Sequence, residues 1–173
     1  NKNCFPISIN QSRVLLNSET YTADVAMVLN SHDTPPDLIE LELTERIFSD
    51  SLDEMAKMMS VLKDLGIRWS IDDFGTGYSS LNLLKKLPVD IIKIDKAFLD
   101  ETETSNVSKI IIRKTVELTQ ELDKMVVCEG VETEEQASYL KAIHCDLAQG
   151  YLYAKPMPMD EFEKLMDSTE VVA

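Results

Sequence analysis

The sequence predicts an α/β fold in a single domain, with a parallel sheet and helices packed outside it. Short apolar runs alternate with longer stretches of helical periodicity along the 173 residues, which is typical of repeated strand–helix units. The apolar share of 44% is enough for a sizeable core, and the length is near that of one typical domain. No linker, low-complexity segment or fixed-period repeat divides the chain, so we treat residues 1–173 as one domain.

The first half of the chain predicts two strands and two helices. In chain order, the expected elements are a strand over residues 5–9, a helix over 22–29, a loop over 32–37, a strand over 38–43 and a helix ending at residue 65. The second strand alternates apolar and acidic residues, as a strand with one face inward does. Asp50 or Ser51 can cap the helix that follows, and Gly66 can provide its left-handed end.

The second half repeats the alternation. The expected elements are a strand over residues 67–71, a glycine-rich loop over 74–78, a helix from 79 or 80 to 87, a strand over 91–94, a helix over 106–122, a strand over 125–128, a helix capped by Thr133 and ending at 143, a strand over 147–153 and a helix over 159–166. About six strands result, and either an open doubly wound sheet or a barrel accommodates them. The absence of a GxGxxG or Walker pattern weakens the dinucleotide-binding sheet.

Composition excludes several functions. The net charge of −14 repels a phosphate backbone, so we expect no general nucleic-acid binding. No apolar run approaches the roughly 20 residues of a membrane helix, and the first ten residues do not resemble a signal peptide. His32 and His144 are too few for a zinc site or a histidine-based triad. Cys4, Cys128 and Cys145 have no metal-type spacing, and we interpret them as reduced thiols of a cytoplasmic protein.

Acidic and amide residues gather at the ends of the predicted strands. In parallel α/β folds the carboxyl ends of strands build the active site, so we expect these side chains to meet at one rim. The residues are Asn10, Glu42, Asp72, Asp73, Glu129 and Gln149. Several carboxylates share a site only if their pKa values rise or a cation lies between them, and an all-oxygen set suits Mg²⁺ or Mn²⁺. Neighbouring acids such as Asp72 and Asp73 can reach two ions roughly 3.5–4 Å apart.

Structural roles compete with these functional ones. The pair Asp72–Asp73 before Phe-Gly-Thr-Gly is also consistent with turn chemistry, in which Gly75 and Gly77 supply backbone freedom. Lys93 lies in an apolar strand, where it could position or deprotonate an attacking water or form a structural ion pair.

Six segments together resemble the EAL domain, a phosphodiesterase family that acts on cyclic di-GMP. They occur in family order and cover essentially the whole chain: Ile7-Ser-Ile-Asn10, Leu41-Glu-Leu-Thr-Glu45, Ile71-Asp-Asp-Phe-Gly-Thr-Gly-Tyr-Ser-Ser-Leu81, Asp90-Ile-Ile-Lys-Ile-Asp95, Cys128-Glu-Gly-Val-Glu-Thr133 and Gln149-Gly-Tyr-Leu-Tyr-Ala-Lys-Pro156. The resemblance implies a TIM-like (β/α) barrel with one antiparallel strand near its start. It also implies Mg²⁺- or Mn²⁺-dependent hydrolysis of cyclic di-GMP to linear pGpG, with two metal ions.

The resemblance also implies roles for individual residues. The metal ligands are Asn10, Glu42, Asp72 and Asp73, with Asp72 as the bridge between two ions. Lys93 contacts the attacking water. Glu129 is an essential acid at the metal centre, and Gln149 lies beside it. The supporting residues are Glu45, Glu132 and the loop residues Gly75, Thr76 and Gly77, with Glu45 holding the loop. The loop over residues 73–79 and the helix after it form a homodimer contact in the family.

One departure from the family is large, because these 173 residues contain no Glu-Ala-Leu tripeptide. A complete domain of this kind has roughly 240–250 residues, so we expect an N-terminally truncated domain with about six of the usual eight strands and without one ligand glutamate. We therefore expect weak or no activity from this polypeptide alone. The alternative function is a non-catalytic cyclic di-GMP receptor or protein-interaction module. The expected location is the bacterial cytoplasm, with any membrane attachment made through other domains.

Overall fold

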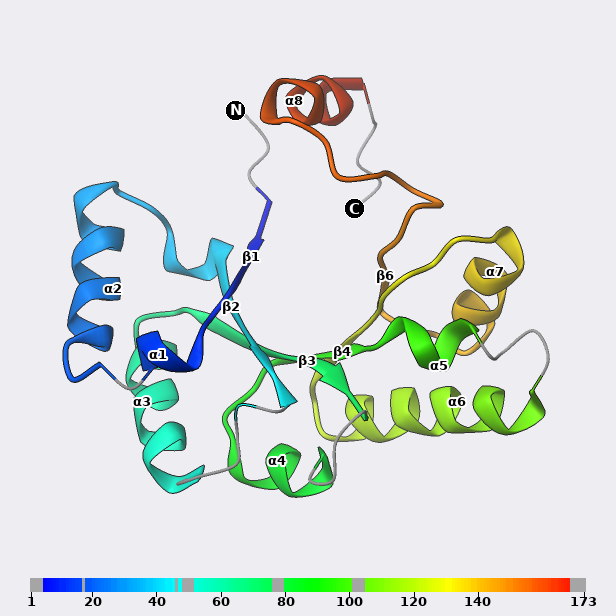
Figure 1. Ribbon diagram of the computed structural model, residues 1–173, viewed down its shortest axis with the longest axis horizontal. Helices are drawn as coiled ribbons and strands as arrows, with labels where there is room; N and C mark the ends of the chain where they lie inside the picture. Colours follow the sequence, from blue (N-terminus) through cyan, green and yellow to red (C-terminus); the bar gives the residue numbers. More distant parts are fainter. Residues whose placement is uncertain are drawn as a thin grey trace.

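Six strands form one parallel sheet in which each strand pairs with the next one along the chain (Figure 1). The computed structural model describes residues 5–16, 18–45, 47, 52–75, 80–100 and 105–168. The strands are β1 (Ile7–Asn10), β2 (Ile39–Thr44), β3 (Arg68–Phe74), β4 (Ile91–Ile94), β5 (Met125–Cys128) and β6 (Leu147–Ala148).

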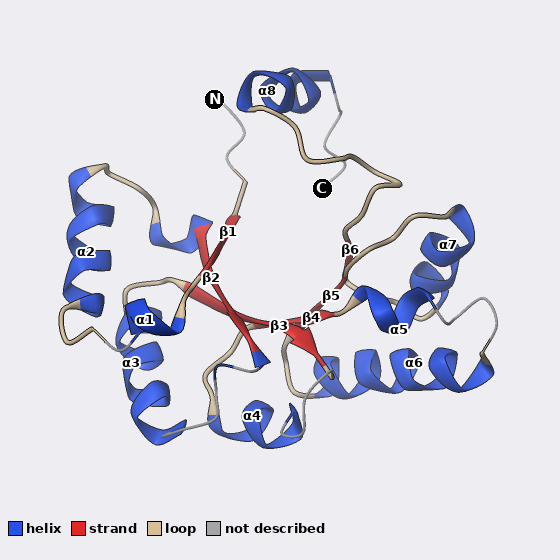
Figure 2. Cartoon of the chain, viewed as in Figure 1, coloured by secondary structure: helices blue, strands red, loops and turns tan. Residues whose placement is uncertain are grey.

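Helices follow most strands and lie outside the curled sheet (Figure 2). They are α1 (Arg13–Leu16), α2 (Tyr21–Ser31), the 3₁₀ turn η1 (Pro36–Leu38), α3 (Leu52–Asp64), α4 (Ser80–Lys86), α5 (Lys96–Asp100), α6 (Asn106–Glu121), α7 (Glu134–Ala142) and α8 (Met159–Ser168). Helix α8 stands apart from the others in the same view. None of the described helices combines the length and the apolar character needed to cross a lipid bilayer.

The sequential strand order decides between the two architectures that the sequence allowed. A doubly wound sheet reverses its strand order at a switch point and carries helices on both faces. Here the order runs from β1 to β6 without reversal, and the sheet curls inside its helices. This confirms the prediction of an incomplete TIM-like barrel. Every pairing among the described strands is parallel, so the antiparallel strand implied by the resemblance is not one of them.

The two faces of the sheet differ sharply in chemistry. Alternate residues of the strands point outward and form the apolar core under the helices, as Leu43, Trp69 and Ile92 do. The residues between them, such as Glu42, Ser70 and Lys93, are buried polar groups. Since neighbours in a parallel ladder share a face, the pairing of Glu42 with Ser70 places the polar series together on the inner face.

The apolar core consists of two clusters that divide at β4. Ile92 packs in the cluster of α3, β2 and β3, whereas Ile94 packs in the cluster of α6, β5 and α7. The strand that contains both residues is therefore the seam between two halves of the sheet.

Several predicted boundaries need correction. The third strand does not end at residue 71, because it continues to Phe74. The last strand is only Leu147–Ala148, and residues 151–153 form a turn. Helices α1 and α5 were not predicted. The expected cap at Asp50 or Ser51 lies outside the described residues, whereas Thr133 caps α7 in a full capping box with Gln136.

Candidate functional site

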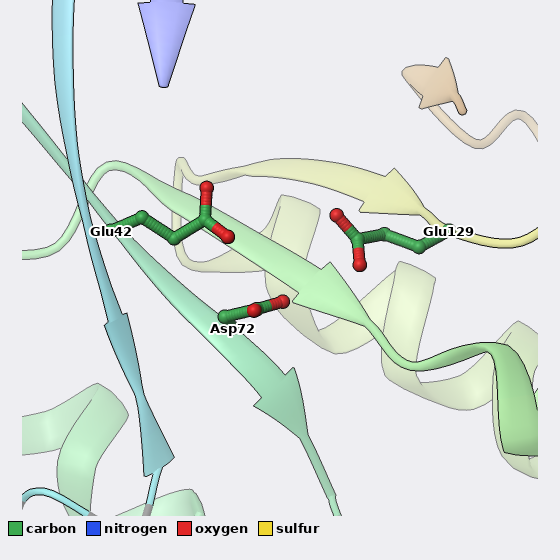
Figure 3. Close-up of side chains that lie close together, drawn as sticks. All are labelled: Glu42, Asp72 and Glu129. Atoms are coloured by element: carbon green, nitrogen blue, oxygen red, sulfur yellow. The ribbon is translucent and has the colours of Figure 1, made fainter. Parts of the chain in front are cut away.

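Three carboxylates from separate parts of the sheet converge on its inner face (Figure 3). They belong to Glu42 in β2, Asp72 in β3 and Glu129 directly after β5, and one oxygen of each lies within 4.8 Å of the others. Glu42 is buried, and the other two side chains are half-buried. We call these three residues the acid cluster.

Lys93 in β4 provides the cation nearest to the acid cluster. Its Nζ lies 2.8 Å from Oε2 of Glu42 and 2.7 Å from Oε1 of Glu129, and the residue is only 5% exposed. Strand β4 pairs with β5 on one side, and β3 lies between β4 and β2 on the other. Lys93 therefore reaches acids on both sides of its own strand. One ammonium group faces three carboxylates, which leaves an excess of negative charge in a site that is partly shielded from solvent.

The pKa values reflect this crowding. Burial alone would lower the pKa of Lys93, but the hydrogen bonds and charges of Glu129 and Glu42 outweigh it and raise that pKa to about 12. Burial raises the pKa of Glu42, an effect that Lys93 opposes and the charge of Asp72 reinforces. The site therefore keeps Lys93 protonated. With one ammonium group for three carboxylates, the charge of the acid cluster has an electrostatic cost.

Asp72 shows how the acid cluster suits a cation. Its Oδ1 is buried and has no hydrogen-bond partner among the described residues. A buried carboxylate oxygen without a donor is costly, and a bound divalent ion is one way to satisfy it. With oxygen ligands only, the chemistry of the set fits a hard ion such as Mg²⁺ or Mn²⁺.

Asp73 lies at an irregularity in β3, next to Asp72 of the acid cluster. The register of β3 against β4 shifts between Ile71 and Phe74, and Asp73 has a φ of 54°. Such a bulge redirects a side chain that regular alternation would send to the opposite face. Burial raises the pKa of Asp73, and so do the neighbouring acids Asp72, Asp95 and Glu129. Asp73 is therefore electrostatically part of the acid-rich rim.

The two predicted amide residues flank the acid cluster. Asn10 ends β1 opposite Glu42 in the ladder, and its side chain is exposed. Gln149 follows β6 and does not lie within a long strand as predicted. Its backbone N–H donates to the Cys128 carbonyl at 2.9 Å, and its own carbonyl accepts from Val131 at 3.0 Å. The chain thus runs past Glu129 at this point.

The predicted supporting residues make contacts outside the acid cluster. Oε2 of buried Glu45 accepts from the Gly75 N–H at 3.2 Å, which ties the end of β2 to the end of β3. Glu132 pairs with Lys96 and so does not point into the cluster. Thr76 and Gly77 lie outside the described residues, as do residues 78 and 79 of the loop expected to form a dimer contact.

Helix α5 contributes contacts that the sequence analysis missed. A Cβ on Gly75 would lie 2.8 Å from the Phe98 ring, and a Cβ on Gly130 would lie 2.5 Å from the Lys96 stem. The helix therefore packs on the backbone just after Asp73 and just after Glu129. Its one visible signal is Asp95, whose Oδ1 accepts from the Ala97 N–H at 2.7 Å in the manner of a helix cap.

The amino-acid sequence matches a known protein family over most of its length. The model of the family described as EAL domain matches residues 1–156. The chain belongs to the EAL domain family. The cyclic di-GMP phosphodiesterase NbdA of Pseudomonas aeruginosa is 40% identical over 128 residues, which cover 74% of this chain and 16% of that protein.

Solved EAL structures have the same fold. The EAL enzyme Bd1971, solved with cAMP and cyclic di-GMP bound, is 33% identical with a TM-score of 0.90, over 94% of this chain and 43% of its own. BlrP1 of Klebsiella pneumoniae, solved as a manganese and cyclic di-GMP complex, is 30% identical with a TM-score of 0.81, over 87% of this EAL chain and 39% of its own. The EAL chain thus spans well under half the length of each of these relatives.

Proposed function

We propose that this EAL chain supplies the catalytic rim of a metal-dependent phosphodiesterase that hydrolyses cyclic di-GMP to linear pGpG. The observation that carries the proposal is the acid cluster of Glu42, Asp72 and Glu129, with Lys93 beside it and one buried Asp72 oxygen to which no described residue donates a hydrogen bond. NbdA, which bears the name of this activity, and BlrP1, which holds manganese and cyclic di-GMP, support the substrate and the cofactor class.

The proposed metal ligands are Asn10, Glu42, Asp72, Asp73 and Glu129, with Mg²⁺ or Mn²⁺ as the cofactor. When bound, such ions polarise the scissile phosphate and lower the pKa of the attacking water. Asp72 lies next to Glu42 on one side and interacts with Asp73 on the other, so it is suited to bridge two ions. Gln149 contacts the substrate or a ligand at the edge beside Glu129, and its backbone hydrogen bonds to Cys128 and Val131 support this role.

Lys93 has a positioning role in this proposal. Its two ion pairs keep it charged, so it donates hydrogen bonds and does not remove a proton. An ammonium group has three N–H donors, and two of them serve Glu42 and Glu129. The third can orient the attacking water or hold a phosphate oxygen, which makes catalysis chiefly a matter of positioning and electrostatics.

Three further proposals concern the surroundings of the site. Residues 1–173 form part of a larger EAL domain, and the absence of a Glu-Ala-Leu tripeptide supports this. The loop over residues 73–79 and α4 form a homodimer contact, which the exposed Leu81 of α4 supports. The domain works in the bacterial cytoplasm and reaches a membrane only through other domains.

The test is a hydrolysis assay with the longer protein that carries this chain. We expect pGpG to accumulate from cyclic di-GMP with Mg²⁺ or Mn²⁺, and Asp72→Asn or Lys93→Met to lower turnover on the order of a hundredfold or more. Asp53→Asn is the matched control, because Asp53 is exposed and its ion pair among the described residues is with Lys86. Undiminished turnover by either site variant would refute the proposal.

The isolated 173-residue polypeptide should be assayed alongside. We expect it to show weak or no turnover even with excess Mn²⁺, because the resemblance assigns one ligand to the Glu-Ala-Leu segment. Calorimetric binding of cyclic di-GMP by the longer protein, without any cleavage, would support the receptor function instead.

A further inference from the structure

Two cysteine side chains touch directly behind the acid cluster. Cys128 is the last residue of β5, and its Sγ lies 3.6 Å from the Sγ of Cys145 in the turn between α7 and β6. Both are free thiols; Cys128 is 1% exposed, whereas Cys145 is half-buried. We propose that this pair is an oxidation site, at which a disulfide forms between β5 and the segment that leads into β6.

The backbone already holds the two residues in place for such a bond. The Val126 N–H of β5 donates to Oδ2 of Asp146 at 2.9 Å, and Cys128 pairs with Ala148 in the parallel ladder of β5 and β6. The two segments therefore cannot drift apart. A disulfide has an S–S distance of about 2.05 Å, so the sulfur atoms have to approach by roughly 1.5 Å. Side-chain rotation and a small shift of the Cys145 turn supply this movement.

The reaction needs an oxidant, and a small-molecule disulfide such as glutathione disulfide meets the requirement. The more exposed Cys145 attacks one sulfur as the thiolate, which forms a mixed disulfide and releases one glutathione thiolate. Cys128 then attacks the Sγ of Cys145, and the bond to the second glutathione breaks. Two electrons and two protons leave the cysteines, and two molecules of glutathione thiol are formed.

The crosslink acts on the acid cluster through the main chain. Glu129 directly follows Cys128, and the Cys128 carbonyl accepts the Gln149 N–H at 2.9 Å. A shift of the Cys145 turn is therefore passed through the pairing of β6 with β5 to Cys128, and it moves Glu129 relative to Glu42 and Asp72. This consequence rests on the proposed metal site, and we expect Mn²⁺ binding to weaken about tenfold, as when residues behind metal ligands are disturbed. The crosslink itself does not depend on that site.

The test treats the metal-free protein with glutathione disulfide and maps its cysteines by mass spectrometry. We expect a peptide pair joined through Cys128 and Cys145, a mass lower by two hydrogen atoms, and full reversal by dithiothreitol. Mn²⁺ binding, measured by calorimetry before and after oxidation, reports the effect on the acid cluster separately.

Two variants make the result decisive. Cys145→Ser, at the more exposed position, should abolish the crosslink, whereas Cys4→Ser should leave it intact. Three unmodified thiols, or a glutathione adduct on Cys145 that Cys128 never resolves, would overturn the proposal. A crosslink that forms without any change in Mn²⁺ binding would overturn the coupling to the acid cluster and leave the oxidation site standing.

Discussion

Lys93 is the residue on which the electrostatic balance of the inner face depends. It is the partner of two acids from different strands, and it is buried with them. The sequence left a structural ion pair and a role in chemistry as alternatives for this residue. The structure shows the ion pairs with Glu42 and Glu129, and the role of Lys93 in chemistry stays a prediction.

We expect Lys93→Met to destabilise the metal-free protein by about 3 kcal/mol, because the change leaves buried carboxylates without their cation. Mn²⁺ should then raise the melting temperature of the variant more than that of the wild type. Urea unfolding measures the first effect, and thermal unfolding with and without Mn²⁺ measures the second. Lys86→Met is the control, because its pair with Asp53 is exposed and should cost less than about 1 kcal/mol.

Tyr21 gives a prediction about pH. Burial raises its pKa to about 12, and its hydroxyl donates to Oε1 of Gln11 at 2.7 Å. Below pH 10 the phenol is neutral in both the folded and the unfolded chain, so its ionisation has no effect on stability. Above pH 10 the unfolded chain ionises first, so stability falls by roughly 1 kcal/mol at pH 11.

Tyr21→Phe should remove this contribution to the loss of stability at alkaline pH. Tyr151→Phe, at an exposed tyrosine, should not remove it. Urea unfolding at pH 8 and pH 11 compares the two variants. Equal losses of stability for Tyr21→Phe and the wild type would count against the buried phenol as the cause.

At the scale of elements, the short helix α5 connects the two strand ends that bear acids. Phe98 packs on Gly75 and Lys96 packs on Gly130, so one helix of five residues touches the backbone beyond both β3 and β5. Gly130 has a φ of 70°, which a residue with a Cβ adopts only at a cost.

We expect Gly130→Ala to destabilise the protein by about 2 kcal/mol or more, because the new Cβ displaces the Lys96 stem as well as straining the backbone. Gly66→Ala is the matched control. Gly66 also has a positive φ, of 100°, but a Cβ there would come no closer than 3.4 Å to Pro36, so only the backbone cost of about 1 kcal/mol applies. Chemical unfolding of both variants separates the two contributions, and equal costs would show that Lys96 adjusts freely.

The sequence predicted well the elements whose ends are marked in the sequence and predicted the others poorly, for physical reasons. Strands β4 and β5 have the predicted bounds because their apolar runs have clear ends. Helix α5 is too short for its periodicity to show. The strand expected over residues 147–153 ends at Ala148, and beyond it Gly150 lies against the Val131 backbone, where a side chain would have no room. Alternation along a sequence does not reveal such a close approach.

The acid-rich rim was predicted because acids at successive strand ends must meet in any parallel sheet. The register shift at Asp73 was not predictable, since it is a property of the pairing of two strands. The ion pairs of Lys93 were likewise one of two alternatives until the strand order was known.

At the scale of the whole molecule, the sheet has two free edges. Among the described strands, β1 pairs only with β2, and β6 only with β5. Ile9 in β1 is 43% exposed. An open edge with apolar side chains favours pairing with another chain, while the net charge of −14 opposes it.

We expect the 173-residue polypeptide to self-associate with rising concentration, and more strongly at high salt, where charge repulsion is screened. Ile9→Lys should reduce this association. Val14→Lys is the control, because Val14 is 82% exposed but lies on α1, away from the strand edge. Sedimentation velocity over a range of concentrations distinguishes the variants, and equal association of both would argue against the β1 edge.

The division of the apolar core at β4 has a mechanical consequence. Glu42 and Asp72 lie on strands that pack on one cluster, Glu129 follows a strand that packs on the other, and Lys93 lies on β4 between the two. A small rotation of one half against the other would lengthen or shorten the distance from Glu129 to Glu42 and Asp72. Such a change needs no direct contact with any of the three acids. The positive charge of Lys93 lies where the two halves meet. A displacement of the helices that cover one half would therefore be transmitted to the acid cluster.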